Sequence, residues 1–209
     1  MRWAAVLLLA ATAAGAHDGV KHKSVEEARQ HAAQTGDAPV GPDTVFPVDL
    51  GGAFTLTDHT GATRTEADPD GRMQLVFFGY ANCPSICAVA MPAMAETVNL
   101  LAGEGIPTTP VMITVDPDRD TVGTMTDPLQ ALHPDFVGLT GTEPELAKVY
   151  DLFSVEKKVV FEDPEHGPIF AHGSFVYLLD GQGSFMTLLP PILSVERMVE
   201  IVASYAVGS

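Results

Sequence analysis

Residues 77–94 read FFGYANCPSICAVAMPAM and contain both cysteines of the chain, Cys83 and Cys87. They follow an apolar run, Gln74–Phe78, that predicts a buried strand, and they precede a segment typical of a helix extending to about Ala102. The cysteines are therefore expected at a strand-to-helix junction, where functional groups gather in α/β sheets. The two cysteines could form a structural disulfide, act as a redox dithiol, or supply part of a metal site.

The rest of the sequence alternates predicted strands and helices. This pattern predicts an α/β fold with a central mixed sheet that helices cover on both faces. The expected strands are a pair around His59–Gly61, then Val111–Val115, Phe136–Leu139, VEKKVVF, SFVYLLD and SFMTLLP, and the expected helices lie in TDPLQAL, EPELAKVYDLFSV and VERMVEIVASYA.

The first 16 residues are typical of a signal peptide, with Arg2, an apolar run and the small residues Ala14–Ala16. The run is shorter than the roughly 20 residues that a spanning helix needs. We expect cleavage after Ala16 and a periplasmic product, with membrane association through an uncleaved leader as the alternative. Residues 17–42 are then a histidine-containing tail and linker, and residues 43–209 form the globular domain.

The composition is strongly acidic, with 27 Asp and Glu against 11 Lys and Arg and a net charge of −16. Such a surface repels nucleic acid and anionic membranes and favours basic partners or cations. A domain of this length needs no disulfide staple. A bridge between two cysteines only four residues apart would also remove little entropy from the unfolded chain. The pair is therefore expected to serve chemistry.

The position of the cysteines favours reactive sulfur. Free N–H groups and the helix dipole lower the pKa of a thiol at a helix N-terminus. If the helix already runs from Cys83, the spacing of four places both sulfurs on one face, and Pro84 fits its first turn. Two such thiolates can oxidise to a disulfide or bind a soft metal ion together.

The spacing C-x-x-x-C differs from the C-x-x-C of a thioredoxin-type oxidoreductase, and a structural zinc site would need four protein ligands. Two thiolates with one imidazole suit copper, above all Cu(I). Seven histidines could supply that imidazole, and His172, just before an apolar strand, is one candidate. His166, in the loop DPEHGP, is a reserve. The seven are His17, His22, His31, His59, His133, His166 and His172.

Several segments together resemble the Sco/SenC family of copper-binding proteins, which take part in cytochrome c oxidase assembly. They are FFGYANCPSIC, VDPDRDT (Val115–Thr121), FVGLTG (Phe136–Gly141), and His172 followed five residues later by Tyr177. Their order and spacing match across roughly Phe54 to Ala206.

The resemblance implies a thioredoxin-like fold in which Cys83, Cys87 and His172 bind one copper ion. Members of the family are described as delivering copper to the binuclear copper site of an oxidase subunit, or as reducing the cysteines of that site. Both roles use the same dithiol, so the expected partner is that oxidase subunit or another copper protein, with a thiol reductant as a further partner.

This sequence departs from the family pattern T-H-C-P-D-x-C-P and from its D-H-S or D-H-T. Asn82 replaces an imidazole beside the first cysteine, and Ser85 and Ala171 replace carboxylates. The loss of negative charge should favour the thiolates, because a nearby carboxylate raises a thiol pKa. All three implied ligands remain.

Other residues near the motifs have plainer interpretations. Asp116-Pro117 is expected to make a turn, and Asp120 to cap it or pair with Arg119, in a loop close to the cysteines. Met91 and Met94 continue the helical face of Cys87 and could offer thioethers, but this spacing is more typical of core methionines.

The tail histidines allow a hypothesis of their own. If His17 becomes the amino terminus, its α-amine and imidazole could chelate Cu(II), and the tail could then capture copper. The alternative is a solvated tail without a role in binding.

We therefore predict an exported thioredoxin-like protein that binds one copper ion and serves oxidase copper-site assembly. The first alternative is a thiol–disulfide reductase in which Cys83 attacks a client disulfide. A peroxidase of the same broad fold is less consistent, because VFFGYAN supplies neither the Thr nor the Pro that such enzymes place before the reactive cysteine. The last alternative is a non-catalytic domain that contains only a disulfide.

Overall fold

The strand that leads to the cysteines lies near the middle of the main sheet. In the computed structural model, which describes residues 49–206, this strand is β3 (Met73–Gly79). It pairs in parallel with β4 (Thr108–Thr114) and antiparallel with β8 (Val176–Leu179). Nearly all side chains of the three strands are buried, as expected for strands covered on both faces.

Among the described residues, the main sheet has seven strands in the order β2-β1-β5-β4-β3-β8-β9. The other four are β1 (Thr55–Asp58), β2 (Thr63–Thr65), β5 (Val137–Thr140) and β9 (Phe185–Leu189). β3, β4 and β5 run parallel, and the remaining pairings are antiparallel. The sheet is therefore mixed, as the sequence predicts.

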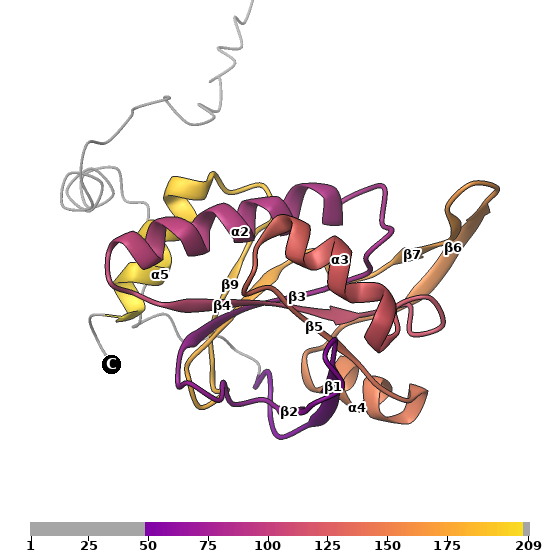
Figure 1. The fold of residues 1–209 in the computed structure, drawn as a ribbon, viewed down its shortest axis with the longest axis horizontal. Coiled ribbons are helices and arrows are strands. Elements are labelled where there is room, and N and C mark those ends of the chain that lie inside the picture. The colour runs from indigo at the N-terminus through magenta and orange to yellow at the C-terminus, as the bar shows by residue number, and fades with distance from the viewer. Residues whose placement is uncertain (1–48, 207–209) are drawn as a thin grey trace, which may run out of the picture. The chain divides into compact units, whose positions relative to one another are not determined.

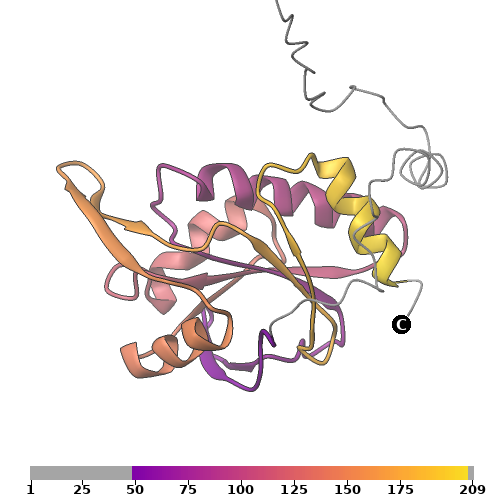
Figure 2. The ribbon, with the colours of Figure 1, turned by 180° about the vertical axis from the view of Figure 1, so that it is seen from behind.

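Helices cover both faces of this sheet (Figure 1). Three of them, α2 (Cys87–Gly103), α3 (Val122–Leu132) and α5 (Val195–Ala206), lie on one face. The fourth, α4 (Glu143–Leu152), lies on the opposite face. The predicted architecture is confirmed, and the same layers are visible from behind in Figure 2.

A two-stranded hairpin lies outside the main sheet and projects beyond it in both views (Figures 1 and 2). It is formed by β6 (Lys158–Asp163) and β7 (Gly167–Ala171), which pair with each other and with no other strand of residues 49–206. The sequence predicts a strand in VEKKVVF but not β7. The available signal was the turn sequence DPEHG followed by the apolar residues of GPIFA.

The start of α2 corrects one expectation. The helix begins at Cys87, and Ile86 is its N-cap residue, so the helix does not run from Cys83. Pro84 lies in the turn before the helix and not in its first turn. The segment from Cys83 to Ile86 forms turns instead, with the Ala88 N–H donating to the Ser85 carbonyl at 3.1 Å.

The predicted signal peptide (residues 1–16), the tail and linker (residues 17–42) and residues 43–48 of the predicted domain lie outside the described residues. Within residues 49–206, no helix combines the length and hydrophobicity needed to cross a bilayer.

Candidate metal centre

The first arm of the candidate centre is the loop between β3 and α2. β3 ends at Gly79, and the Cys83 N–H donates to the Tyr80 carbonyl at 3.2 Å, which turns the chain back toward the sheet. The Cys83 side chain is 8% exposed, whereas Cys87, the first residue of α2, is fully buried. The turn brings the two sulfurs together, although Cys83 is not in the helix.

The second arm is the segment between β7 and β8, which contains His172. Because β8 pairs directly with β3, this segment reaches the same region as the cysteine loop. The Nδ1 atom of His172 lies 2.9 Å from the Gly173 carbonyl oxygen. A carbonyl can only accept, so Nδ1 carries a proton, and in the neutral imidazole the lone pair is therefore on Nε2.

The two arms meet at a single cluster. One ligand atom each from Cys83, Cys87 and His172 lies within 4.8 Å of the other two. The Cys87 Sγ and the His172 Nε2 are 3.8 Å apart, so the free lone pair faces the sulfur. Within residues 49–206, this is the one group of three or more potential metal-ligating side chains that comes together in this way.

The two thiols are electrostatically different. A hydrogen bond from the Cys87 thiol lowers the pKa of Cys83 to about 4, although burial opposes this shift. The same hydrogen bond, together with burial, raises the pKa of Cys87 above its ordinary value. At neutral pH the pair therefore holds one thiolate, on Cys83, and one thiol.

Aromatic rings surround the imidazole. The ring centroids of Phe77 and Tyr80 lie 5.8 Å and 6.0 Å from that of His172, both in edge-to-face arrangements. Phe170, on β7, packs edge-on against Tyr80 at 5.5 Å. Burial and the charge of nearby Cys83 raise the pKa of Tyr80 to about 12, so its hydroxyl stays protonated. The rings restrict the orientation of the imidazole and reduce its access to solvent.

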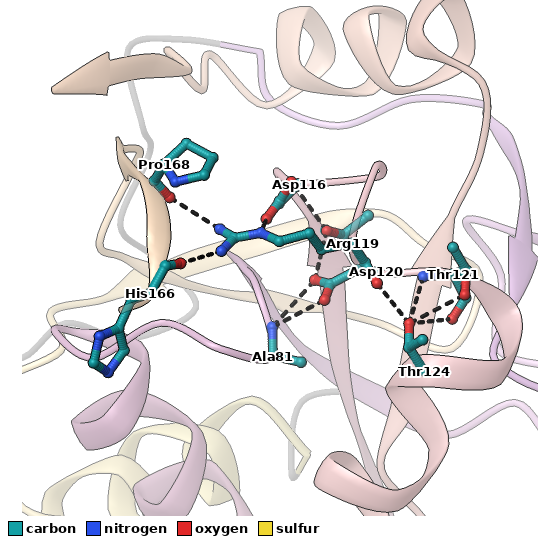
Figure 3. Close-up of polar contacts among 9 residues, drawn as sticks. Ala81, Asp116, Arg119, Asp120, Thr121, Thr124, His166 and Pro168 are labelled. Atoms are coloured by element: carbon teal, nitrogen blue, oxygen red, sulfur yellow. Dashed lines mark hydrogen bonds and ion pairs between the residues drawn. The ribbon is translucent and has the colours of Figure 1, made fainter. Parts of the chain in front are cut away.

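The loop after β4 lies beside the cysteine loop, as the sequence predicts, and it also contacts the β6–β7 turn (Figure 3). Asp120 accepts a hydrogen bond from the Ala81 N–H at 3.1 Å, and Ala81 lies two residues before Cys83. The expected pairing of Asp120 with Arg119 is wrong, because Arg119 forms its ion pair with Asp116 instead. Asp120 is buried, and its carboxylate accepts a hydrogen bond from the Thr114 hydroxyl at 2.7 Å.

The remaining candidates lie elsewhere in the fold. His166 is in the β6–β7 turn, where its Nδ1 lies 3.1 Å from the Asp163 carboxylate, and it is not part of the cluster. Met91 and Met94 are buried in the hydrophobic core, which confirms their plainer interpretation. His17, His22 and His31 lie outside the described residues.

The donor set fits a soft metal ion. Copper, particularly as Cu(I), prefers sulfur and imidazole ligands. The cluster offers one thiolate, a second thiol that can ionise, and an imidazole nitrogen. Metal binding through Nε2 requires the tautomer with its proton on Nδ1, and the hydrogen bond from Nδ1 to the Gly173 carbonyl favours that tautomer. The same dithiol could also exchange with a disulfide.

The fold and the cluster together define the class of protein: a thioredoxin-like α/β domain with a dithiol and a histidine gathered at the end of a central strand. The chain matches the SCO1/SenC family over residues 42–207 and belongs to that family.

Comparison with individual proteins agrees with this assignment. An SCO2-like protein of Rickettsia felis is 36% identical over 140 residues, which is 66% of this chain and 68% of the relative. The copper-bound crystal structure of Arabidopsis thaliana ScoI is similar with a TM-score of 0.71, at 26% identity over 77% of this chain and 99% of that chain. Copper-bound yeast Sco1 gives a TM-score of 0.66 at 32% identity, over 76% of this chain and 91% of that chain.

Proposed function

We propose that this protein binds one copper ion through Cys83, Cys87 and His172, and that it supplies the copper to the binuclear copper site of cytochrome c oxidase. The observation that carries the proposal is the convergence of three soft or borderline donors within 4.8 Å of one another. The copper-bound Sco structures from Arabidopsis and yeast support copper as the cargo.

Each ligand has a distinct part in loading. The Cys83 thiolate, already ionised at neutral pH, is the first attractive group for an arriving cation. Cys87 holds its proton in the metal-free protein, so copper must displace that proton to gain the second sulfur. His172 then supplies a neutral nitrogen whose orientation is fixed by the Gly173 carbonyl.

The family and the net charge support the choice of partner, and the N-terminal leader supports the location. We place the protein in the periplasm, exported by the N-terminal leader, where the copper-site subunit of the oxidase would receive the ion. The net charge of −16 favours a partner with a basic contact surface and attracts copper cations.

The test is a copper titration of the reduced protein, with His172→Ala and a matched control, His166→Ala. His166 belongs to the same hairpin region but lies outside the cluster. We expect one tightly bound copper in the wild type and in His166→Ala, with sulfur-to-Cu(II) charge-transfer absorption. His172→Ala should lose affinity and change this spectrum. No stoichiometric binding by the wild type would contradict the proposal.

A second candidate function is thiol–disulfide reduction, which the low pKa of Cys83 favours. The Cys83 thiolate would attack a client disulfide, releasing one client thiolate and forming a mixed disulfide. Cys87 would then attack Cys83 and release the second client thiolate, so that the client is reduced and this dithiol is oxidised. A separate thiol reductant would restore the dithiol. This reaction should survive His172→Ala, whereas copper retention should not.

A further inference from the structure

Arg119 lies beside the candidate centre but is not one of its potential ligands. It belongs to the loop between β4 and α3, and its guanidinium points toward the β6–β7 turn (Figure 3). Nη1 donates to the His166 carbonyl, and Nη2 donates to the Pro168 carbonyl at 2.9 Å. One side chain therefore binds two backbone carbonyls at the start of β7.

These two bonds matter because the hairpin has no ladder hydrogen bonds to the main sheet. β6 and β7 pair only with each other, and most side chains of β6 are exposed. The position of β7 therefore depends on side-chain contacts. β7 ends at Ala171, the residue before His172. A displacement of β7 therefore also moves the backbone of His172 and changes the position of its imidazole.

The third nitrogen of the Arg119 guanidinium is held from within the loop that carries it. This nitrogen, Nε, donates to Asp116, a carboxylate that is itself buried. The adjoining Asp120 accepts from Thr114 and Ala81, and Thr140 donates to the Asp120 carbonyl at 2.9 Å. The loop that holds Arg119 is thus bonded to the end of β4, to β5 and to the cysteine loop.

A second contact connects Arg119 with the imidazole through a ring. The Arg119 Cζ lies 5.5 Å from the centroid of the Tyr80 ring, and this ring packs edge-on against His172. A cation over an aromatic face is attractive and restrains the ring. Arg119 therefore restrains both the backbone that carries His172 and a ring that contacts it.

We propose that Arg119 is the positioning residue for His172: its guanidinium ties the β6–β7 turn to the sheet and so holds the imidazole against the two sulfurs. This inference rests on the proposed copper site. It adds a residue that would set the affinity of the site without contacting the metal, as groups outside the ligand set commonly do.

The test compares Arg119→Gln with Arg197→Gln, a matched control that removes an arginine whose ion pair lies on α5. We expect Arg119→Gln to weaken copper binding about tenfold and to move the Cu(II) spectrum toward that of His172→Ala. In the copper-free protein, hydrogen exchange should become faster in β6 and β7 but not in β3. Arg197→Gln should leave all three measurements unchanged.

A double-variant cycle separates positioning of His172 from a general effect on the site. If Arg119 acts through His172, adding Arg119→Gln to His172→Ala should change copper affinity by less than about twofold. A further tenfold loss in that background, or an unchanged affinity of Arg119→Gln alone, would overturn the inference. Wild-type protein that binds no copper would instead contradict the proposed function.

The single variant leaves the buried Asp116 without its partner and could therefore fail to fold. Arg119→Gln combined with Asp116→Asn removes both charges and repeats the measurement without a buried unpaired carboxylate. The expected results are the same, and near-native copper affinity in this folded double variant would overturn the inference.

Discussion

At the scale of single residues, the two cysteines differ more than their spacing suggests. Cys83 lies in a turn and is slightly exposed, whereas Cys87 begins a helix and is fully buried. The hydrogen bond between them stabilises the thiolate on Cys83 and the thiol on Cys87. The dithiol therefore has a defined nucleophile, and a cation meets one ionised sulfur and one protonated sulfur.

This difference predicts the pH dependence of alkylation in the reduced, metal-free protein. Cys83 should react with iodoacetamide at a rate that is already constant near neutral pH and declines only as the pH falls toward about 4, where the thiolate is protonated. Cys87 should remain unmodified, because it is buried and protonated. Mass spectrometry of the labelled peptides would distinguish the two sites.

The control for that experiment is Cys87→Ala, which removes the hydrogen-bond donor. The pKa of Cys83 should then rise, so alkylation near pH 6 should become slower. A wild-type Cys83 that titrates near the ordinary value of 9.0 would contradict the proposed role of Cys87.

Asp120 predicts a pH effect on stability. Burial raises the pKa of Asp120 from 3.8 to about 6, so between these values the folded state binds more protons than the unfolded state. Stability should therefore fall as the pH rises through this range, with Asp120 contributing up to about 3 kcal/mol to the loss.

Asp120→Asn lacks this ionisation. Relative to wild type, its free energy of unfolding should increase as the pH rises from about 4 to about 7, as urea unfolding can measure. A difference between the two proteins that is constant over this range would show that Asp120 keeps an ordinary pKa.

At the scale of elements, β3 and α2 must approach closely to bury Cys87. A Cβ added at Gly79, the last residue of β3, would lie 3.1 Å from the Cys87 sulfur and 2.7 Å from the Phe77 ring. Gly79→Ala should therefore destabilise the fold by about 1–3 kcal/mol and weaken copper binding, because it displaces a proposed ligand.

Gly103→Ala is the matched control, since nothing lies within 4 Å of a Cβ added at the end of α2. It should leave copper affinity unchanged and stabilise the protein slightly, by up to about 1 kcal/mol. Thermal unfolding would measure the stability of both variants, and competition with a copper chelator would measure their copper affinities. Equal copper affinities would show that the sulfur tolerates the added methyl group.

The elements also show how far the sequence alone could lead. Apolar runs predicted most of β3 and the second half of β4, because strands buried on both faces are rich in apolar residues along their length. Only β6 of the hairpin was predicted, because β7 is short and its burial does not alternate along the strand, so it lacks the periodicity of a packed strand.

The candidate site also has one part that the sequence could predict and one part that it could not. Local spacing places the cysteines at a strand-to-helix junction, and the family resemblance implies His172. The ion pair of Arg119 with Asp116, and its bonds to the hairpin, depend on β4 and β7 meeting in space. No local pattern encodes that meeting, and the nearby Asp120 offered an equally plausible partner.

At the scale of the whole molecule, copper binding should be coupled to stability, because the three proposed ligands converge only in the folded chain. Each tenfold excess of free Cu(I) over the dissociation constant should add about 1.4 kcal/mol, or roughly 3–6 °C in the unfolding temperature. In His172→Ala the shift should be smaller. Because both unfolded chains keep the same two cysteines, copper binding through these cysteines in the unfolded state cancels in this comparison.

The most direct test of the proposed centre is X-ray absorption at the copper edge on the reduced, Cu(I)-loaded protein, measured beside loaded His172→Ala. We predict two sulfur ligands and one nitrogen ligand for the wild type, and loss of the nitrogen with retention of both sulfurs in the variant. A wild-type spectrum with sulfur ligands alone, or a nitrogen signal that persists in His172→Ala, would contradict a site formed by Cys83, Cys87 and His172.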